Sequence, residues 1–227
     1  MTKQDDATRK SDRAAALMRE ARLIPVLTIT DAAKAVPLAR ALVAGGVRML
    51  EVTLRTAAGA EAARAIHGEV PDAIVGLGTV VTPAELEYAR AFGLRFAFSP
   101  GATPALLDAA AELGVIFVPG VQTASELMAA AERGFDTVKF FPAEPAGGIP
   151  AIKALAGPFP QTRFCPTGGI AEDRIEAWLA QPNVVAVGGS WLAPSAEVER
   201  EDWNAITERA RRATARFVTG KQGENRT

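Results

Sequence analysis

The chain has 227 residues, of which 25 are basic and 26 are acidic, so its formal charge is −1. Proteins that bind nucleic acids through phosphate contacts typically carry a basic surplus, and disordered chains are typically poor in apolar residues. The near-neutral charge and the 48% hydrophobic content exclude both classes, and they predict a globular protein with a substantial core.

The sequence also bears on the cellular compartment. Its polar N-terminal region has no apolar stretch of the signal-peptide type, and no later apolar run reaches the roughly 18 residues that a membrane span needs. Cys165 is the single cysteine, so the chain cannot form an intrachain disulfide, as suits a reducing compartment. We therefore expect a cytoplasmic protein.

From Leu23 onward, short apolar runs alternate with alanine-rich segments of helical spacing. Several of the helical segments end in a glycine that is followed at once by an apolar run, and Gly93, Gly114 and Gly134 lie 21 and 20 residues apart. This spacing fits one helix plus one strand, so the sequence predicts a βα repeat. In chain order, the expected strands cover residues 24–28, 49–54, 74–79, 96–99, 116–119, 137–140, 163–166 and 184–188.

Helix start signals lie between these runs at Asp31, Thr82, Thr103 and Thr123, the last with Glu126 in a capping-box pattern. Repeated βα units without a break in composition predict an α/β fold, a single (β/α)8 TIM barrel. A doubly wound open sheet is the rival architecture, but it normally has a glycine fingerprint after the first strand, and none is present. We expect one domain over 1–227, made of an N-terminal extension with an additional helix (1–22, the helix from residue 11), the barrel (23–215) and a polar tail (216–227).

Candidate catalytic residues lie near the ends of the second and sixth expected strands. Period-two alternation places Glu51 and Arg55 on one face of the second strand, where they offer an acid/base carboxylate and a cation for a substrate carboxylate, unless this is a solvated edge strand. Lys139 lies between apolar neighbours in the sixth strand and is predicted to point into the barrel. Lysine is rarely fully buried, and a buried amine is a nucleophile for carbonyl carbons. The alternative is a lysine paired with Glu51 for structure alone.

The loops after the seventh and eighth strands are predicted to bind an anion. Each contains paired glycines, Gly168 with Gly169 and Gly188 with Gly189, and Ser190 follows the second pair. Glycines let backbone amides approach phosphate oxygens, and these two loops form the usual phosphate site of such barrels.

Five other residue positions receive structural interpretations. His67 stands at a helix C-terminus, where a cation complements the helix dipole. Cys165 is expected to pack in the interior, because the sequence has no other histidine to activate it. Trp178, Trp191 and Trp203 lie in or near helices and are expected to pack.

The motifs EVTLRT, GLGTV, FSPG, TVKFFPAE, RFCPTGGI and GGSWL, in this order, resemble those of the bacterial 2-keto-3-deoxy-6-phosphogluconate (KDPG) and 4-hydroxy-2-oxoglutarate (KHG) aldolases. The resemblance runs from about residue 23 to residue 215. It implies a trimeric class I aldolase of the Entner–Doudoroff pathway, which cleaves the phosphorylated keto acid to pyruvate and glyceraldehyde 3-phosphate. It also implies cleavage of 4-hydroxy-2-oxoglutarate to pyruvate and glyoxylate, with no metal and no cofactor.

The resemblance further assigns roles to individual positions. Lys139 corresponds to the Schiff-base lysine, Glu51 to the proton shuttle, and Thr167 to the contact with the reacting hydroxyl. Arg55 and Thr79 correspond to the residues that hold the pyruvate carboxylate. The phosphate is assigned to Gly168, Gly169, Gly189 and Ser190.

Three alternatives stay open at this point. One is a galactonate-specific aldolase of the same type, and another is a cofactor-free sugar-phosphate isomerase or epimerase on the same barrel. The third is a sensor of phosphorylated metabolites that has the pocket but no activity. Only an aldolase is expected to form a covalent adduct with pyruvate.

Overall fold

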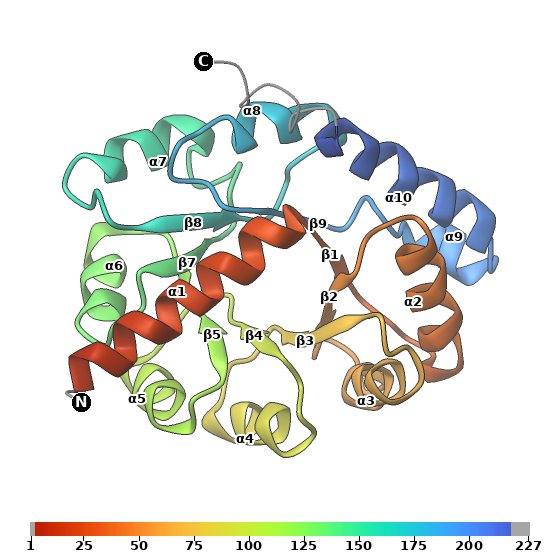
Figure 1. Ribbon diagram of the computed structural model, residues 1–227, viewed down its shortest axis with the longest axis horizontal. Helices are drawn as coiled ribbons and strands as arrows, with labels where there is room; N and C mark the ends of the chain where they lie inside the picture. The colour runs from red at the N-terminus through yellow and green to blue at the C-terminus, as the bar shows by residue number, and fades with distance from the viewer. Residues whose placement is uncertain (1–2, 219–227) are drawn as a thin grey trace.

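The computed structural model describes residues 3–218 as an α/β fold in which parallel strands curl into a half-barrel, with helices around them (Figure 1). None of the helices within these residues is long and apolar enough to cross a bilayer. The strands are β1 (Leu23–Leu27), β2 (Met49–Thr53), β3 (Ile74–Gly78), β4 (Phe96–Phe98), β5 (Ile116–Val118), β6 (Gly120–Val121), β7 (Thr137–Phe140), β8 (Arg163–Pro166) and β9 (Val187–Gly189). The helices are α1 (Lys3–Ala21), α2 (Ala35–Ala44), α3 (Gly59–Glu69), α4 (Pro83–Ala91), α5 (Pro104–Leu113), α6 (Ala124–Ala131), α7 (Gly148–Ala156), α8 (Ile175–Leu179), α9 (Ser195–Glu199) and α10 (Trp203–Val218).

The strands form two parallel sheets, one in the order β5-β4-β3-β2-β1-β9 and one in the order β6-β7-β8. Several backbone contacts connect them. An isolated bridge pairs Thr167 after β8 with Gly188 of β9, and the Lys139 amide of β7 donates to the Pro119 carbonyl at 2.8 Å. The fifth expected strand ends one residue early, at Val118 before Pro119, and the short strand β6 follows it.

The strands are buried on both faces, as expected for parallel strands under helices. Every residue of β1, β2 and β7 is buried. The larger core cluster lies between strands and helices, and a second cluster on the inner side contains Phe96, Phe98 and Cys165. The polar residues Glu51 and Lys139 are therefore held by strands whose packing is mainly apolar.

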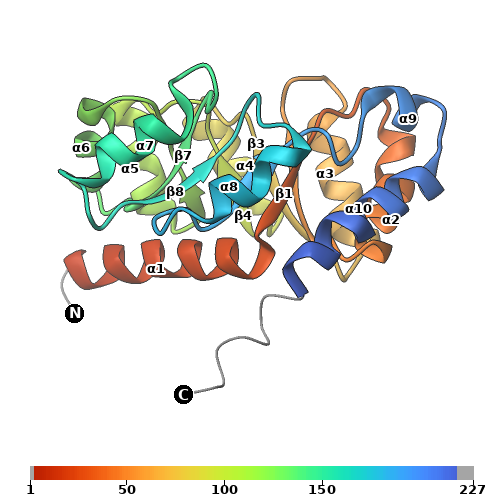
Figure 2. The same ribbon diagram turned by 90° about the horizontal axis from the view of Figure 1, so that it is seen from above.

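Helix α1 lies across the end of the barrel at which the strands begin (Figures 1 and 2). Its Ala14 and Met18 belong to the inner core cluster. The buried Ser11 hydroxyl accepts hydrogen bonds from the amides of Asp136 and Thr137 at 3.1 Å each, which ties α1 to the start of β7. The helix begins at Lys3 and not at residue 11 as expected.

The helix boundaries agree with the predicted signals. Thr82 and Thr123 each form a capping box, and Thr103 caps α5. Gly93, Gly114 and Gly134 all have positive φ, as a helix-ending glycine requires. At the other end of the chain α10 continues to Val218, so the first residues of the expected polar tail are helical, and the rest of that tail lies outside the described residues.

Candidate active site

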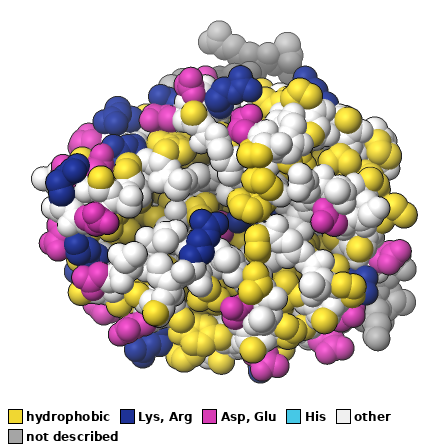
Figure 3. Space-filling view, turned by 180° about the vertical axis from the view of Figure 1, so that it is seen from behind, with side chains coloured by type: hydrophobic (Ala, Val, Ile, Leu, Met, Phe, Trp, Pro, Cys, Tyr) yellow, Lys and Arg dark blue, Asp and Glu magenta, His cyan; other side chains and the backbone are white. Residues whose placement is uncertain are grey.

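A cavity of about 210 Å³ opens at the C-terminal ends of the strands, on the face opposite α1. Figure 3 shows this face, with basic side chains near its centre beside a shallow hollow. Residues from the ends of several strands line the cavity: Val26, Arg55, Phe141, Thr167, Gly168, Gly169, Ile170, Gly189, Ser190 and Trp191. Barrel enzymes place their chemistry at this end of the strands.

Lys139 and Glu51 form an ion pair inside the barrel. The Lys139 side chain from β7 donates to Glu51 Oε1 from β2 at 2.9 Å, and the two residues are 2% and 1% exposed. The Lys139 Nζ also lies 5.3 Å from the ring centroids of Phe98 and Phe141. A carboxylate in direct contact with a buried amine can accept its proton, which leaves the amine free to attack a carbonyl.

Gly78 at the end of β3 makes room for the Glu51 carboxylate. A Cβ at this position would lie 2.3 Å from Glu51 Oε1 and 2.6 Å from Cγ. Any larger residue would displace the carboxylate from the amine of Lys139, so the glycine in GLGTV has a direct role in the geometry of the pair.

Arg55 and Thr79 lie together at the rim. The Arg55 Nε donates to Thr79 Oγ1 at 3.1 Å, and Arg55 is exposed toward the cavity although β2 itself ends at Thr53. Thr79 has φ +59°, which is a strained conformation for a β-branched residue. The hydroxyl and the guanidinium are thus presented side by side, as a binding site for a carboxylate requires.

The two glycine loops meet along one wall of the cavity. Gly168 and Gly169 have φ of +104° and +77°, so their backbone takes a course that few other residues permit. Thr167 is buried, and a Cβ at Gly188 would lie 2.3 Å from its hydroxyl oxygen. This wall of the cavity is formed by the glycine backbone and Ser190. No Asp or Glu is among the residues that line the cavity.

The cavity and the ion pair are adjacent but not continuous in this conformation. Arg55, Thr167, Gly168, Gly169, Gly189 and Ser190 line the cavity, whereas Lys139, Glu51 and Thr79 do not. Phe141 lines the cavity and also lies beside the Lys139 amine, so a single aromatic side chain is in contact with both parts of the site.

Sequence reasoning missed Glu144, which follows the lysine strand in TVKFFPAE. Its carboxylate accepts from Trp178 Nε1 at 2.9 Å and lies 4.0 Å from Arg174 Nε, while its amide donates to the Gly168 carbonyl at 3.0 Å. The amide of Ala143 likewise donates to the Thr167 carbonyl at 2.8 Å. Glu144 thereby holds the loop after β7 against the loop after β8. The sequence feature that could have indicated it is a second charged residue, besides Lys139, in the largely apolar motif TVKFFPAE.

The residues given structural interpretations divide into two groups. Cys165 is fully buried, and burial raises the pKa of its thiol to about 12, partly offset by Lys139, while Trp178 is buried beneath α8. His67 lies in the last turn of α3, away from the cavity. Trp191 packs against the core, as expected, and it also lines the cavity.

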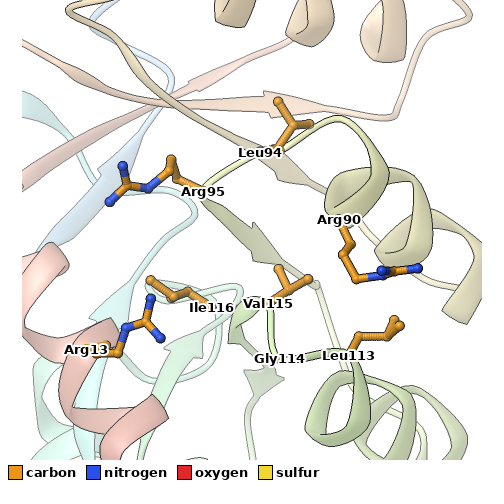
Figure 4. A pocket seen from close by; sticks show the side chains of 9 residues that line it. Arg13, Arg90, Leu94, Arg95, Leu113, Gly114, Val115 and Ile116 are labelled. Carbon is orange, nitrogen blue, oxygen red and sulfur yellow. The ribbon is translucent and has the colours of Figure 1, made fainter.

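A second hollow, of about 220 Å³, lies on the face where the strands begin (Figure 4). Arg13 and Arg95 lie at one end of it, and Arg90 lies at the other. The hollow contains no residue of the ion pair or of the glycine loops. Within residues 3–218, no cluster of three or more His, Cys, Asp or Glu side chains that could hold a metal ion is found.

The comparisons with known proteins agree on one family. The family model described as "KDPG and KHG aldolase" matches residues 14–209. The chain belongs to the KDPG and KHG aldolase family. A 2-dehydro-3-deoxy-phosphogluconate aldolase of Pseudoalteromonas atlantica is 52% identical over 85% of this chain and 90% of its own length. The KHG/KDPG aldolase of Escherichia coli K12 is 50% identical over 84% of this chain and 90% of its own.

Solved structures of this aldolase family match the fold as well. The KDPG aldolase of Legionella pneumophila, with pyruvate captured as a covalent carbinolamine intermediate, has a TM-score of 0.86 and 44% identity, over 88% of this chain and 97% of that one. The aldolase of Zymomonas mobilis ZM4 with 3-phosphoglycerate has the same TM-score and identity, over 90% and 96%. Both support an α/β aldolase scaffold for this chain.

Proposed function

We propose that the protein is a class I aldolase that cleaves 2-dehydro-3-deoxy-6-phosphogluconate to pyruvate and glyceraldehyde 3-phosphate in the Entner–Doudoroff pathway. The observation that carries this proposal is the buried pair of Lys139 and Glu51, with 2.9 Å between amine and carboxylate, next to a cavity lined by glycine loops. The names of the relatives, all aldolases of this substrate class, support the same reaction. Cleavage of 4-hydroxy-2-oxoglutarate to pyruvate and glyoxylate is part of the proposal.

The pair supplies the first steps of the reaction. Glu51 accepts a proton from the Lys139 amine, and the neutral nitrogen attacks the C2 carbonyl to form a carbinolamine. Glu51 then returns a proton to the departing hydroxyl, so that water leaves and a protonated imine remains. Because Nζ lies against two aromatic rings, the positive charge of the imine is favoured by their π faces.

The imine withdraws the electrons of the carbon–carbon bond that breaks. Glu51 takes the proton of the C4 hydroxyl as the C3–C4 bond cleaves, the aldehyde leaves, and the bonding pair enters the imine as an enamine. Glu51 then protonates C3, and hydrolysis releases pyruvate and regenerates Lys139. The imine itself is the electron sink, so the reaction balances without a cofactor.

The two anionic groups of the substrate are assigned to opposite ends of the site. We assign the pyruvate carboxylate to Arg55 and Thr79, whose hydrogen bond of 3.1 Å holds both donors in one place. The reacting hydroxyl is assigned to Thr167. The phosphate is assigned to the loops that contain Gly168, Gly169, Gly189 and Ser190, since amides and a hydroxyl without a neighbouring carboxylate suit a dianion.

The remaining parts of the proposal concern architecture and surroundings. We infer a closed (β/α)8 barrel in one domain with α1 as its additional helix, supported by the bridge between Thr167 and Gly188 and the hydrogen bond from Lys139 to Pro119. We also infer a homotrimer, from the family resemblance. A cytoplasmic location is inferred from a composition with one cysteine.

Borohydride reduction in the presence of pyruvate tests the function directly. The parent protein should gain one covalent adduct on the peptide that contains Lys139, and Lys139→Met should gain none and lose several orders of magnitude in turnover. Glu51→Gln should still be labelled, but more slowly, while turnover falls by about 10²–10⁴-fold. Circular dichroism of each variant serves as the control for folding. A label on Lys34 or Lys153, or normal turnover by Lys139→Met, would contradict the assignment and favour an isomerase.

A further inference from the structure

Trp191 is the one cavity-lining residue whose polar atom has no role in the proposed mechanism. Its indole is partly exposed and lines the cavity with Gly189 and Ser190. None of the hydrogen bonds among the described residues involves the indole N–H of Trp191. A tryptophan N–H is a donor only, and it normally finds an acceptor when its ring is part of a binding surface.

The orientation of the ring follows from its contact with Gly189. A Cβ at Gly189 would lie 2.7 Å from both Cδ1 and Nε1 of Trp191, whereas Cγ is 3.9 Å away. The edge of the indole that carries the N–H therefore lies directly over the Gly189 backbone. This places the donor at the end of β9, in the cavity wall to which Ser190 also belongs.

We propose that the indole N–H of Trp191 donates a hydrogen bond to the phosphate of the substrate. The inference rests on the proposed function and adds a specificity-determining residue to it. Arg55 is the only charged residue among those that line the cavity, and Thr79 holds it at the rim. The wall near Trp191 consists of glycines, Ser190 and Ile170, so an oxygen of an anion bound there meets donors and no competing acceptor carboxylate.

The substitution Trp191→Phe removes the donor and keeps an aromatic ring. Its kcat/KM on 2-dehydro-3-deoxy-6-phosphogluconate should fall about 10- to 100-fold, the range of a lost hydrogen bond to a charged group. Its kcat/KM on the phosphate-free 4-hydroxy-2-oxoglutarate should change by less than about 3-fold, because both substrates share the pyruvate end. Ser190→Ala provides the comparison for a second donor in the same loop.

Trp203→Phe is the matched control, since Trp203 lies in α10 and packs against the core outside the cavity. It should leave both rates unchanged. Equal losses on the two substrates in Trp191→Phe would assign the indole to the shared end of the substrate and overturn the proposal. Unchanged rates on both would also overturn it.

A second variant keeps the test decisive if Trp191→Phe fails to fold. Gly189→Ala adds a methyl group against the N–H edge of the ring and should produce the same selective loss on the phosphorylated substrate. The trapping of pyruvate on Lys139 is measured in parallel. If the parent protein traps no pyruvate, the proposed function fails. If the parent and Trp191→Phe trap it equally while the phosphorylated substrate is unaffected by the substitution, only the role of Trp191 fails.

Discussion

At the scale of single residues, the site depends on how closely side chains approach one another inside the barrel. Lys139 and Glu51 have opposite charges in a region with almost no solvent, and each is the ion-pair partner of the other. Breaking such a pair by removing one partner lowers the free energy of unfolding by about 3–5 kcal/mol. A small displacement of one partner is expected to lower turnover before it lowers stability. If the pair is catalytic as proposed, neighbouring residues without charge should influence turnover through its position.

Gly78→Ala tests that dependence. The new methyl group would lie within 2.3 Å of the Glu51 carboxylate, so the carboxylate must move away from Lys139. Turnover should fall by about 10²-fold or more, because a shift of roughly 1 Å is enough for such a loss. Gly68→Ala is the control, since a Cβ there meets nothing within 4 Å. Steady-state kinetics of the two variants should differ strongly, and equal kinetics would show that Glu51 needs no fixed position.

The buried thiol gives a prediction with a definite pH dependence. Burial raises the pKa of Cys165 from 9.0 to about 12, so the folded protein holds the thiol protonated where the unfolded chain does not. At pH 8.5 a thiol-reactive disulfide reagent should leave the native protein unlabelled and label one thiol in urea.

The same shift affects stability. The contribution of this thiol is complete below pH 9 and is lost as the pH rises from about 9 toward 12, because over that range the unfolded chain binds fewer protons. Urea unfolding of the parent and of Cys165→Ala should therefore differ more at pH 8 than at pH 10. Rapid labelling of the native protein would contradict the raised pKa.

At the scale of elements, local sequence signals predicted most of the fold. The expected strands at 137–140 and 163–166 coincide with β7 and β8, because a glycine or polar turn marks each end of these apolar runs. The fifth strand ends at Val118 before Pro119, with β6 as an unexpected short strand after it, and β9 begins at Val187 and not at residue 184. These differences arise where pairing across the sheet, which a single sequence does not display, decides the boundary.

Long-range contacts explain what the sequence did not reveal about the site. The burial of Lys139 next to Glu51 and the position of the glycine loops at the cavity could be predicted, because their residue types are unusual at strand ends. The position of Glu144 could not, since it depends on a hydrogen bond with Trp178, 34 residues along the chain, that only the folded chain forms. The role of Ser11 is of the same kind, because its partners lie about 125 residues further along the chain.

Ser11→Ala tests how firmly α1 is attached. The hydroxyl accepts from two amides at the start of β7, and its loss leaves both without that partner in a buried place. The free energy of unfolding should fall by about 1–3 kcal/mol, measured by urea denaturation. Asp12→Ala, which removes an exposed pair with Arg163, should cost no more than about 1 kcal/mol. Equal effects of the two substitutions would mean that α1 does not depend on Ser11.

At the scale of the whole molecule, the question is how copies of the chain assemble. Leu192 is buried within its own chain and Trp191 faces the cavity, so neither residue is available for a contact between subunits. The large apolar side chains that are exposed include Val81, Phe92 and Met128, on or beside α4 and α6. A contact between subunits is expected to cover such side chains.

Light scattering should report a particle of about 70 kDa at micromolar concentration, three times the 23.8 kDa of one chain. The reason is the proposed homotrimer, with apolar side chains such as Met128 covered by a neighbouring copy. The same measurement after dilution shows whether the assembly is stable. A mass near that of a single chain would contradict the trimer while leaving the chemistry of Lys139 untouched.

The course of α1 beneath the strands has a practical consequence. Helix α1 starts, and α10 ends, on the side of the molecule where the strands begin, while substrate must reach the cavity from the opposite side (Figure 2). A protein immobilised on a solid support through the start of α1 or through the end of α10 would present its cavity to the solution. Such a preparation should retain access to dissolved substrate, so this architecture suits a flow reactor in which the catalyst is fixed and the sugar acid passes over it.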